Sequence, residues 1–345
     1  MIENKHIYIL AVTAVLAGLL SSCSKYGSGT IDPKSEGIVR FSPALEQAVV
    51  STRGELINPG ESKQDFPTDR VFFASAWTGT TKDFGYDKVA YKTTASGGYW
   101  ITVFGSGGYE GKDKEYLWKK GSEKTFYAYS NLPAAAGAAS VESATSAGQT
   151  LKYDLSKCSD AADQKDILLG FYKGNGNNRG LASITFKHPL TAVGFVIDDL
   201  DGETVKTISL SGVYKSGTAT MDGTGSISWS SQVAGGTTSQ SKEGGLGIAS
   251  SDPKIVGSWF LLIPQTITGT AKVTISLEFV SGKTATAELS EGSWIAGQPN
   301  LYKLKYVGVS PMDAVLTVTL ADWQTLKNKD GGDVFDVTFG TKPTE

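Results

Sequence analysis

Residues Ile184–Ile197 read ITFKHPLTAVGFVI, and two short runs of apolar, aromatic and β-branched side chains overlap this stretch. The runs, Ala182–Phe186 and Thr191–Ile197, have the composition of β-strands, because Val, Ile, Thr and Phe favour extended backbone. Neither run shows the 3.6-residue period of an amphipathic helix. The stretch therefore predicts strands as the building units of the fold.

The same pattern recurs on both sides of this stretch. Upstream, the predicted strands are Ile38–Phe41, Ala44–Val50, Arg70–Trp77, Lys88–Thr93, Tyr99–Phe104, Thr125–Ser130 and Ile167–Tyr172. Downstream, they are Lys206–Leu210, Ala219–Met221, Ile227–Trp229, Trp259–Ile263, Lys272–Phe279, Thr284–Leu289, Leu301–Val307, Val315–Leu320 and Val334–Phe339. The sharpest turn cluster is Lys173–Gly180 (KGNGNNRG), and the Ser/Gly/Thr-rich tract Ser230–Ser251 is expected to be a long mobile loop.

Composition and charge agree with an all-β protein. The chain has 345 residues and 41 glycines, and no convincing amphipathic helix of three turns interrupts the short strands. Short strands at close spacing, separated by turn residues, favour β-sandwiches over a βαβ fold. The net charge of −3 is too small to indicate nucleic acid as a partner.

The N-terminal residues have the pattern of a lipoprotein signal. Lys5 precedes the apolar run Ile7–Leu20, which is too short to span a bilayer comfortably. Leu20-Ser21-Ser22-Cys23 then matches a lipobox, in which the cysteine is lipidated and the signal is cut in front of it. We expect a signal peptide at residues 1–22, a lipid anchor on Cys23 and a polar tether over residues 23–36. The alternative is an ordinary signal peptide with a chance cysteine.

Few residues point to catalysis. His188 is the only histidine after the signal and lacks a Gly-x-Ser-x-Gly companion, so a packed histidine is the better interpretation. Cys158 has no cysteine partner once Cys23 carries lipid, and a buried thiol is expected. Asp198, Asp199 and Asp201 form only a fragment of a calcium loop. The sequence predicts no enzyme, no metal site and no cofactor.

Seven tryptophans are spread along the chain and mostly fall in strand patterns, which is typical of core or strand-end aromatics. One or two of them could instead form a flat surface on which a sugar stacks. Clustered tryptophans at the surface would favour glycan binding.

Taken in order, the motifs resemble the fimbrillin family, the lipoprotein-precursor subunits of type V pili in Gram-negative anaerobes. The resemblance rests on Leu20–Cys23, Ile38–Phe41, Thr52-Arg53, Asp69–Phe73, Lys124–Pro133 (KTFYAYSNLP), Asp166–Leu169, Ile184–Ile197, Phe260–Gln265 (FLLIPQ), Ser293–Tyr302 (SWIAGQPNLY) and Ala321–Trp323. Each motif is weak alone, and their joint order carries the resemblance.

The resemblance implies two transthyretin-like β-sandwich domains in tandem, residues 37–175 and 176–345. It also implies assembly by donor-strand exchange, in which a protease cuts after Arg53, the first strand leaves, and a C-terminal strand of another subunit replaces it. Arg40 is a poorer cleavage site because it lies inside the predicted strand. The implied donor residues are Val334, Phe335, Val337 and Phe339, unless Val334–Phe339 is an ordinary last strand of its own domain.

These features leave three functions open. The first is a pilus subunit or tip adhesin at the outer membrane and fimbrium, with other pilin subunits as partners and a host or bacterial surface receptor or glycan as a further one. The second is a monomeric glycan-binding surface lipoprotein, which would use exposed aromatics and the predicted loop Ser230–Ser251. The third is a secreted enzyme, which the residues favour least.

Overall fold

A computed structural model of the chain describes residues 37–46, 63–105, 112–176, 180–250, 254–307 and 315–321. Within these ranges the protein is built almost wholly of strands, as predicted, and the helical elements are the single 3₁₀ turns η2 Leu155–Lys157 and η3 Ala161–Asp163. None of the helices in the described ranges has the length and apolar character needed to cross a bilayer.

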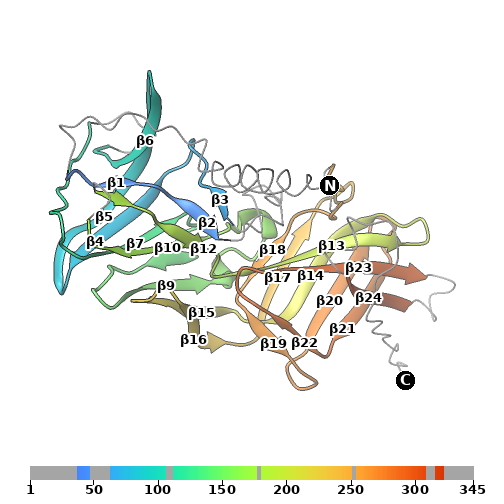
Figure 1. Cartoon of the computed structure of the whole chain (residues 1–345). Coiled ribbons are helices and arrows are strands. Elements are labelled where there is room, and N and C mark those ends of the chain that lie inside the picture. Colours follow the sequence, from blue (N-terminus) through green and yellow to red (C-terminus); the bar gives the residue numbers. More distant parts are fainter. Residues whose placement is uncertain are drawn as a thin grey trace, which may run out of the picture.

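The first sheet has ten strands in the order β11-β1-β6-β5-β4-β7-β10-β12-β2-β3. Its strands are β1 Arg40–Phe41, β2 Ala44–Glu46, β3 Lys63–Asp65, β4 Phe72–Thr78, β5 Thr81–Thr94, β6 Gly97–Thr102, β7 Lys124–Ser130, β10 Leu168–Gly174, β11 Leu181–Ala182 and β12 Thr185–Lys187. Because β1 and β2 follow each other in one segment, as do β11 and β12, the two ends of this sheet lie close together. The sheet thus folds back on its own apolar face (Figure 1).

Aromatic side chains fill the interior of this folded sheet. Phe66 lies 5.4 Å from Phe72, 5.4 Å from Trp100 and 5.0 Å from Phe186, measured between ring centroids. All four rings are buried. Edge-to-face and tilted ring pairs of this kind add to the burial of apolar area, which is the main force that holds such a sheet closed.

A second sheet has the order β16-β15-β9-β8 and packs on the first. Its strands are β8 Ala139–Val141, β9 Gly148–Asp154, β15 Ser216–Asp222 and β16 Ile227–Val233. The buried Gln149 side chain donates to the carbonyl oxygens of Ala128 on β7 (3.0 Å) and Gly170 on β10 (3.2 Å). These bonds tie the second sheet to β7 and β10, on the face of the first sheet that points away from its aromatic interior.

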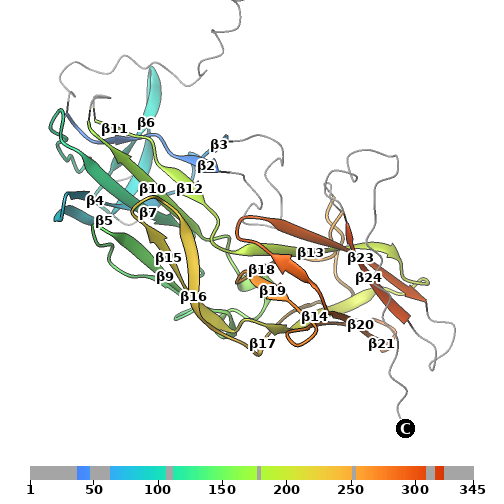
Figure 2. The same ribbon diagram turned by 60° about the horizontal axis from the view of Figure 1, so that its bottom comes forward.

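The C-terminal part is a pair of four-stranded sheets around a shared core (Figure 2). One sheet has the order β18-β13-β23-β24, the other β17-β14-β20-β21, and β19 pairs with β22. Their strands are β13 Thr191–Asp199, β14 Val205–Val213, β17 Gly236–Ser241, β18 Phe260–Leu262, β19 Gln265–Ile267, β20 Val273–Phe279, β21 Thr284–Leu289, β22 Gly292–Trp294, β23 Pro299–Val307 and β24 Val315–Ala321. In β20 (VTISLEF), Val273, Ile275, Leu277 and Phe279 are buried and alternate with half-buried residues, as the two-residue period of a strand requires.

One expectation from the sequence is wrong. The tract Ser230–Ser251 is not one long loop, since β16 continues to Val233 and β17 occupies Gly236–Ser241. β17 pairs with β14, and Thr238 and Gln240 on it are buried. Ser, Gly and Thr are typical of loops, but here they form a strand that packs against the rest of the protein.

Strand pairing joins segments from both sides of the expected domain boundary at residues 175 and 176. β11 and β12 pair with β1, β2 and β10 of the first sheet. Likewise β15 pairs with β9 in the second sheet. The division into residues 37–175 and 176–345 stays a prediction, and the first sheet needs residues up to Lys187.

Candidate functional site

Segment 37–46, the N-terminal strand of the described structure, lies in a groove of the first sheet. Its side chains alternate: Val39, Phe41, Pro43 and Leu45 are buried, while the residues between them are half-buried or exposed. This strict two-residue period puts every buried side chain on one face of the strand, toward the core. The segment thus inserts into the sheet as an apolar strand.

One wall of the groove is the segment that contains β11 and β12. The backbone N–H groups of Arg40, Ser42 and Ala44 each donate, over 2.9 Å, to a carbonyl oxygen on this wall. The acceptors are Gly180, Ala182 and Ile184, again at a spacing of two residues. This is the regular pattern of a parallel strand pair, and it fixes the register of the N-terminal strand.

The opposite wall is formed by β6 and by residues 116–118. Val39 donates its backbone N–H to the carbonyl of Tyr116 (2.8 Å), and the N–H of Trp118 donates to the carbonyl of Gly37. Phe41 is paired with Trp100 of β6 in antiparallel register. The N-terminal strand therefore has backbone partners on both edges, as an interior strand does.

The floor of the groove is aromatic. The ring of Phe41 meets the rings of Phe72 (5.7 Å) and Phe126 (6.0 Å) edge to face. Val39, Phe41 and Leu45 are each 3 % exposed or less. Full burial of one such side chain contributes about 1.5–3 kcal/mol, so a chain break beyond the strand would not by itself release it.

Gly180 sets how closely the wall and the strand approach. Its φ of +82° lies in the left-handed region, and a β-carbon built on it would lie 2.4 Å from the carbonyl oxygen of Ile38. Glycine adopts this conformation without a steric penalty and leaves room for the neighbouring backbone. The turn cluster seen in the sequence thus ends in the residue against which the N-terminal strand packs.

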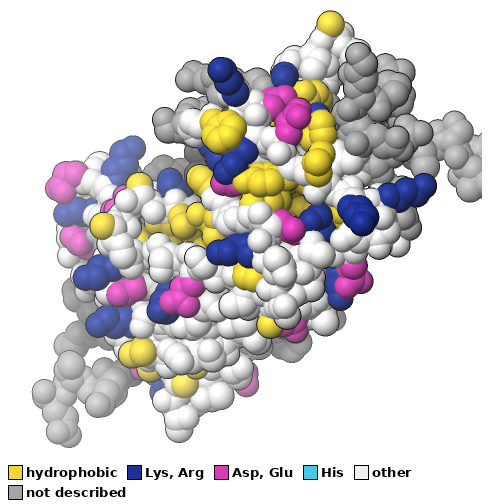
Figure 3. All heavy atoms as spheres, turned by 90° about the vertical axis from the view of Figure 1, so that its left-hand side faces the viewer, with side chains coloured by type: hydrophobic (Ala, Val, Ile, Leu, Met, Phe, Trp, Pro, Cys, Tyr) yellow, Lys and Arg dark blue, Asp and Glu magenta, His cyan; other side chains and the backbone are white. Residues whose placement is uncertain are grey.

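Charged side chains support the wall formed by β6 and residues 116–118, and Figure 3 shows basic and acidic side chains interspersed over the face of the molecule that lies on the left of Figure 1. The Arg40 guanidinium lies over the Tyr99 ring, 4.5 Å from its centroid, and Lys114 pairs with Asp87 at 2.8 Å. The hydrogen bond to Asp87 raises the pKa of Lys114. Tyr116 also donates its hydroxyl to Asp87, and burial, followed by this hydrogen bond, raises its pKa. These contacts fasten residues 114–116 to β5.

Most residues predicted to act in assembly fall outside the described residues. Cys23, Arg53, Val334, Phe335, Val337 and Phe339 all lie there, as do the signal, the tether and Trp323. Arg40 lies inside a strand, β1, as predicted, and its backbone N–H is bonded to the carbonyl oxygen of Gly180. The described strand β2 ends at Glu46, before Arg53.

The residues that the sequence suggested for catalysis or metal binding have structural roles in the fold. His188 is buried, and its Nδ1 donates to Asp166 Oδ1 over 2.7 Å. Cys158 is a buried free thiol, and burial raises its pKa. Asp199 accepts the backbone N–H of Asp201 in a turn, and the described residues contain no cluster of His, Cys, Asp and Glu with the arrangement of a metal site.

The tryptophans mostly belong to the core. Trp100, Trp118, Trp259 and Trp294 are buried, and Trp77 and Trp229 are half-buried. The indole N–H of Trp229 is bonded to the carbonyl of Pro189 at 2.8 Å. Among the described tryptophans, these positions agree with the expected core and strand-end roles.

With the fold and the groove in place, comparison with known proteins assigns the chain to a family. The model of the fimbrillin-like family matches residues 66–323, so the chain belongs to this family of structural and adhesion proteins. No curated protein matches the sequence.

Solved structures support the fold. A putative cell adhesion protein from Bacteroides uniformis is similar with a TM-score of 0.50 and 13 % identity, over 85 % of this chain and 99 % of that one. A putative cell adhesion protein from Bacteroides ovatus is similar with a TM-score of 0.50 and 14 % identity, over 83 % of this chain and 96 % of that one. Both chains share with this protein the arrangement of strands.

The sequence predicts strands at Tyr99–Phe104 and Ala182–Phe186, but it does not show that they flank the N-terminal strand. It predicts no strand at residues 116–118, and it places Ala182–Phe186 in a second domain. The available signal was Gly180, a glycine directly before an apolar pair, which is where a backbone of another segment can approach closely.

Proposed function

We propose that the protein is a structural subunit or tip adhesin of a type V pilus, exported as a lipoprotein precursor and assembled by protease-triggered donor-strand exchange. The observation that carries the proposal is the N-terminal strand, which is apolar on one face and hydrogen-bonded on both edges within the first sheet. Membership of the fimbrillin-like family supports it. Other pilin subunits are the partners it requires, and a surface receptor or glycan is a further partner for a tip subunit.

The precursor would reach the outer membrane through its lipid. Cys23 in Leu20-Ser21-Ser22-Cys23 is the proposed acylation site, with residues 23–36 as the tether. A chain with more than one acyl group is held stably at a membrane, whereas a single myristoyl chain binds only marginally. The protein would therefore stay at the cell surface until a protease separates the body from the anchor.

Cleavage after Arg53 would break the covalent link between the N-terminal strand and the rest of the chain, so that an incoming strand could displace it. If the strand left, the carbonyl oxygens of Gly180, Ala182 and Ile184 would lose their backbone donors and the aromatic floor would be exposed. Unpaired edges and exposed apolar surface are unfavourable, so the groove should exchange its strand for another rather than stay empty.

The proposed replacement is Val334–Phe339 of another copy. Phe335, Val337 and Phe339 are spaced two residues apart, as are Phe41, Pro43 and Leu45 in the groove. A strand with this spacing can place three apolar side chains on the aromatic floor while its backbone bonds both walls. Repetition of such a head-to-tail contact gives a filament, because the contact does not close on itself.

Two variants test the proposal. After treatment with a trypsin-like protease, the parent protein should lose the N-terminal strand and polymerise, while Arg53→Ala should keep the full-length chain and stay monomeric in size-exclusion chromatography. Val337→Asp should be cut like the parent but fail to polymerise. Polymerisation of cleaved Val337→Asp at the parental rate would contradict the donor assignment.

A further inference from the structure

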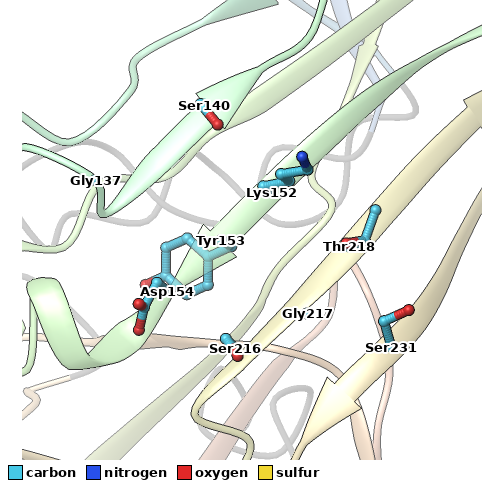
Figure 4. A pocket seen from close by; sticks show the side chains of 9 residues that line it. All are labelled: Gly137, Ser140, Lys152, Tyr153, Asp154, Ser216, Gly217, Thr218 and Ser231. Atoms are coloured by element: carbon cyan, nitrogen blue, oxygen red, sulfur yellow. The ribbon is translucent and has the colours of Figure 1, made fainter.

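The outer face of the second sheet contains a polar pocket that strand exchange does not use. It is a shallow cavity of about 220 Å³ whose lining includes Ser140 on β8, Lys152 on β9, Thr218 on β15 and Ser231 on β16. Figure 4 shows these side chains spread over the four strands, with Lys152 and Thr218 on neighbouring strands, where they are paired in register. The pocket is thus built mainly on the strands of the second sheet.

The hydroxyl groups of the pocket are available to a ligand. Ser140, Ser216, Thr218 and Ser231 are exposed or half-buried, and within the described ranges none of their side-chain oxygens bonds to another protein group. Each hydroxyl can donate one hydrogen bond and accept others. The lining therefore presents several adaptable donors and acceptors to one small volume.

The one lysine of the lining is already paired, and the pocket keeps a carboxylate. The ammonium group of Lys152 is paired with Glu142 of the neighbouring segment. Asp154 Oδ1 accepts the backbone N–H (3.0 Å) and the hydroxyl (2.6 Å) of Ser156, which leaves its other oxygen as an acceptor. Because the lysine is already paired and the Asp154 carboxylate repels anions, the lining favours an uncharged ligand over a phosphate or a carboxylate.

Ser231 occupies an unusual backbone position. Its φ is +52°, in the left-handed region, and it lies in a β-bulge where β16 places Ser231 and Gln232 opposite Gly217 of β15. Glycine is the residue that adopts this conformation without strain, and the chain uses glycine freely elsewhere. Bulges re-aim side chains, and strain in the backbone is concentrated at functional sites.

We propose that this pocket binds a neutral sugar unit of a glycan through Ser231, Thr218, Ser140 and the free oxygen of Asp154. Sugars are uncharged and offer several hydroxyls, which match the donors and acceptors of the lining. The cavity is smaller than the ~300–1,000 Å³ that bury a drug-sized ligand, and its open form suits one residue of a longer chain. The strained serine supplies a hydroxyl that glycine would lack.

Binding is tested with the full, uncleaved chain and the methyl glycosides of glucose, galactose and mannose, by saturation-transfer NMR. At least one of the three should bind, and inorganic phosphate and glucuronate should not compete. Ser231→Gly should weaken binding by about fivefold or more, the effect of one lost hydrogen bond, without lowering the melting temperature. Asp201→Gly, which relieves another non-glycine residue at φ +52° outside the pocket, should bind like the parent.

Three results would overturn the proposal: no binding of any of the three glycosides, stronger binding of phosphate or glucuronate, or unchanged binding by Ser231→Gly. Because the uncleaved chain is used, these results do not depend on strand exchange. A failure here leaves the proposed assembly intact, and a failure to polymerise leaves the pocket intact.

Discussion

The backbone of Gly180 lies so close to Ile38 that a β-carbon on residue 180 would stand 2.4 Å from the Ile38 carbonyl oxygen. This contact joins the wall of the groove to the first residues of the N-terminal strand. A substitution at residue 180 can therefore test how tightly the N-terminal strand is held, without changing the strand itself.

Gly180→Ala should destabilise the protein in two ways. The left-handed conformation costs an L-residue roughly 1–2 kcal/mol, and the clash with Ile38 adds to this. Urea unfolding should show a larger loss than for Gly79→Ala, where φ is +58° but no atom lies within 4 Å of the added carbon. Equal losses at the two positions would show that the contact with Ile38 is not important for stability.

Phe41 should be the main apolar contribution of the N-terminal strand. Phe41→Ala removes a ring that is 3 % exposed and packs on Phe72 and Phe126. Truncation of a buried phenylalanine costs about 3–5 kcal/mol, and the strand should become sensitive to protease. Ser42→Ala, at an exposed position of the same strand, should stay within about 0.5 kcal/mol of the parent. Resistance of Phe41→Ala to proteolysis would show that Phe41 does not hold the N-terminal strand in its groove.

Cys23 should carry the lipid anchor. Cys23→Ala should abolish incorporation of a fatty-acid label, because the cysteine sulfur forms the thioether to the lipid. It should also stop signal cleavage at this position, because the signal is cut in front of the lipidated cysteine. Labelling in vivo and mass spectrometry of the membrane fraction measure both effects. Undiminished label in the variant would rule out Leu20–Cys23 as a lipobox.

The buried pair of His188 and Asp166 should matter for stability rather than for chemistry. Loss of one partner leaves the other buried without its hydrogen bond, which costs about 1–3 kcal/mol. His188→Leu should therefore be strongly destabilising in urea unfolding, and His188→Leu with Asp166→Leu should recover much of the loss. A double variant as unstable as the sum of its parts would contradict a direct coupling of the two side chains.

Burial should make Tyr127 a source of alkaline instability. Burial, followed by the nearby charge of Asp222, raises the pKa of Tyr127 to about 12. A phenol whose pKa is raised on folding stabilises the native state fully below its unfolded pKa near 10, and this contribution is lost as the pH rises from about 10 through about 12. Tyr127→Phe should flatten the fall in melting temperature over this interval. A parallel fall in both proteins would assign the effect to other groups.

Short-range patterning was enough to locate many strands. The predicted Thr284–Leu289 coincides with β21, and Lys272–Phe279 and Thr125–Ser130 match β20 and β7 to within one residue. These segments alternate buried and less buried positions or are rich in β-branched and aromatic residues, and such features are local. The error at Ser230–Ser251 arose where the side chains are small and polar, because burial there comes from neighbouring segments and not from hydrophobicity.

The amino-acid sequence by itself determined that this protein is all-β, with aromatic side chains as its core and without a recognisable catalytic set. It also carries the ordered motifs that indicate a fimbrillin. Only the tertiary structure decided that Gly180–Ile184 and residues 116–118 form the walls around the N-terminal strand, that His188 meets Asp166, and that Ser231 borders a pocket. The reason is physical: strands pair through backbone N–H and C=O groups that are the same in every residue, so the choice of partner depends on the packing of the whole chain.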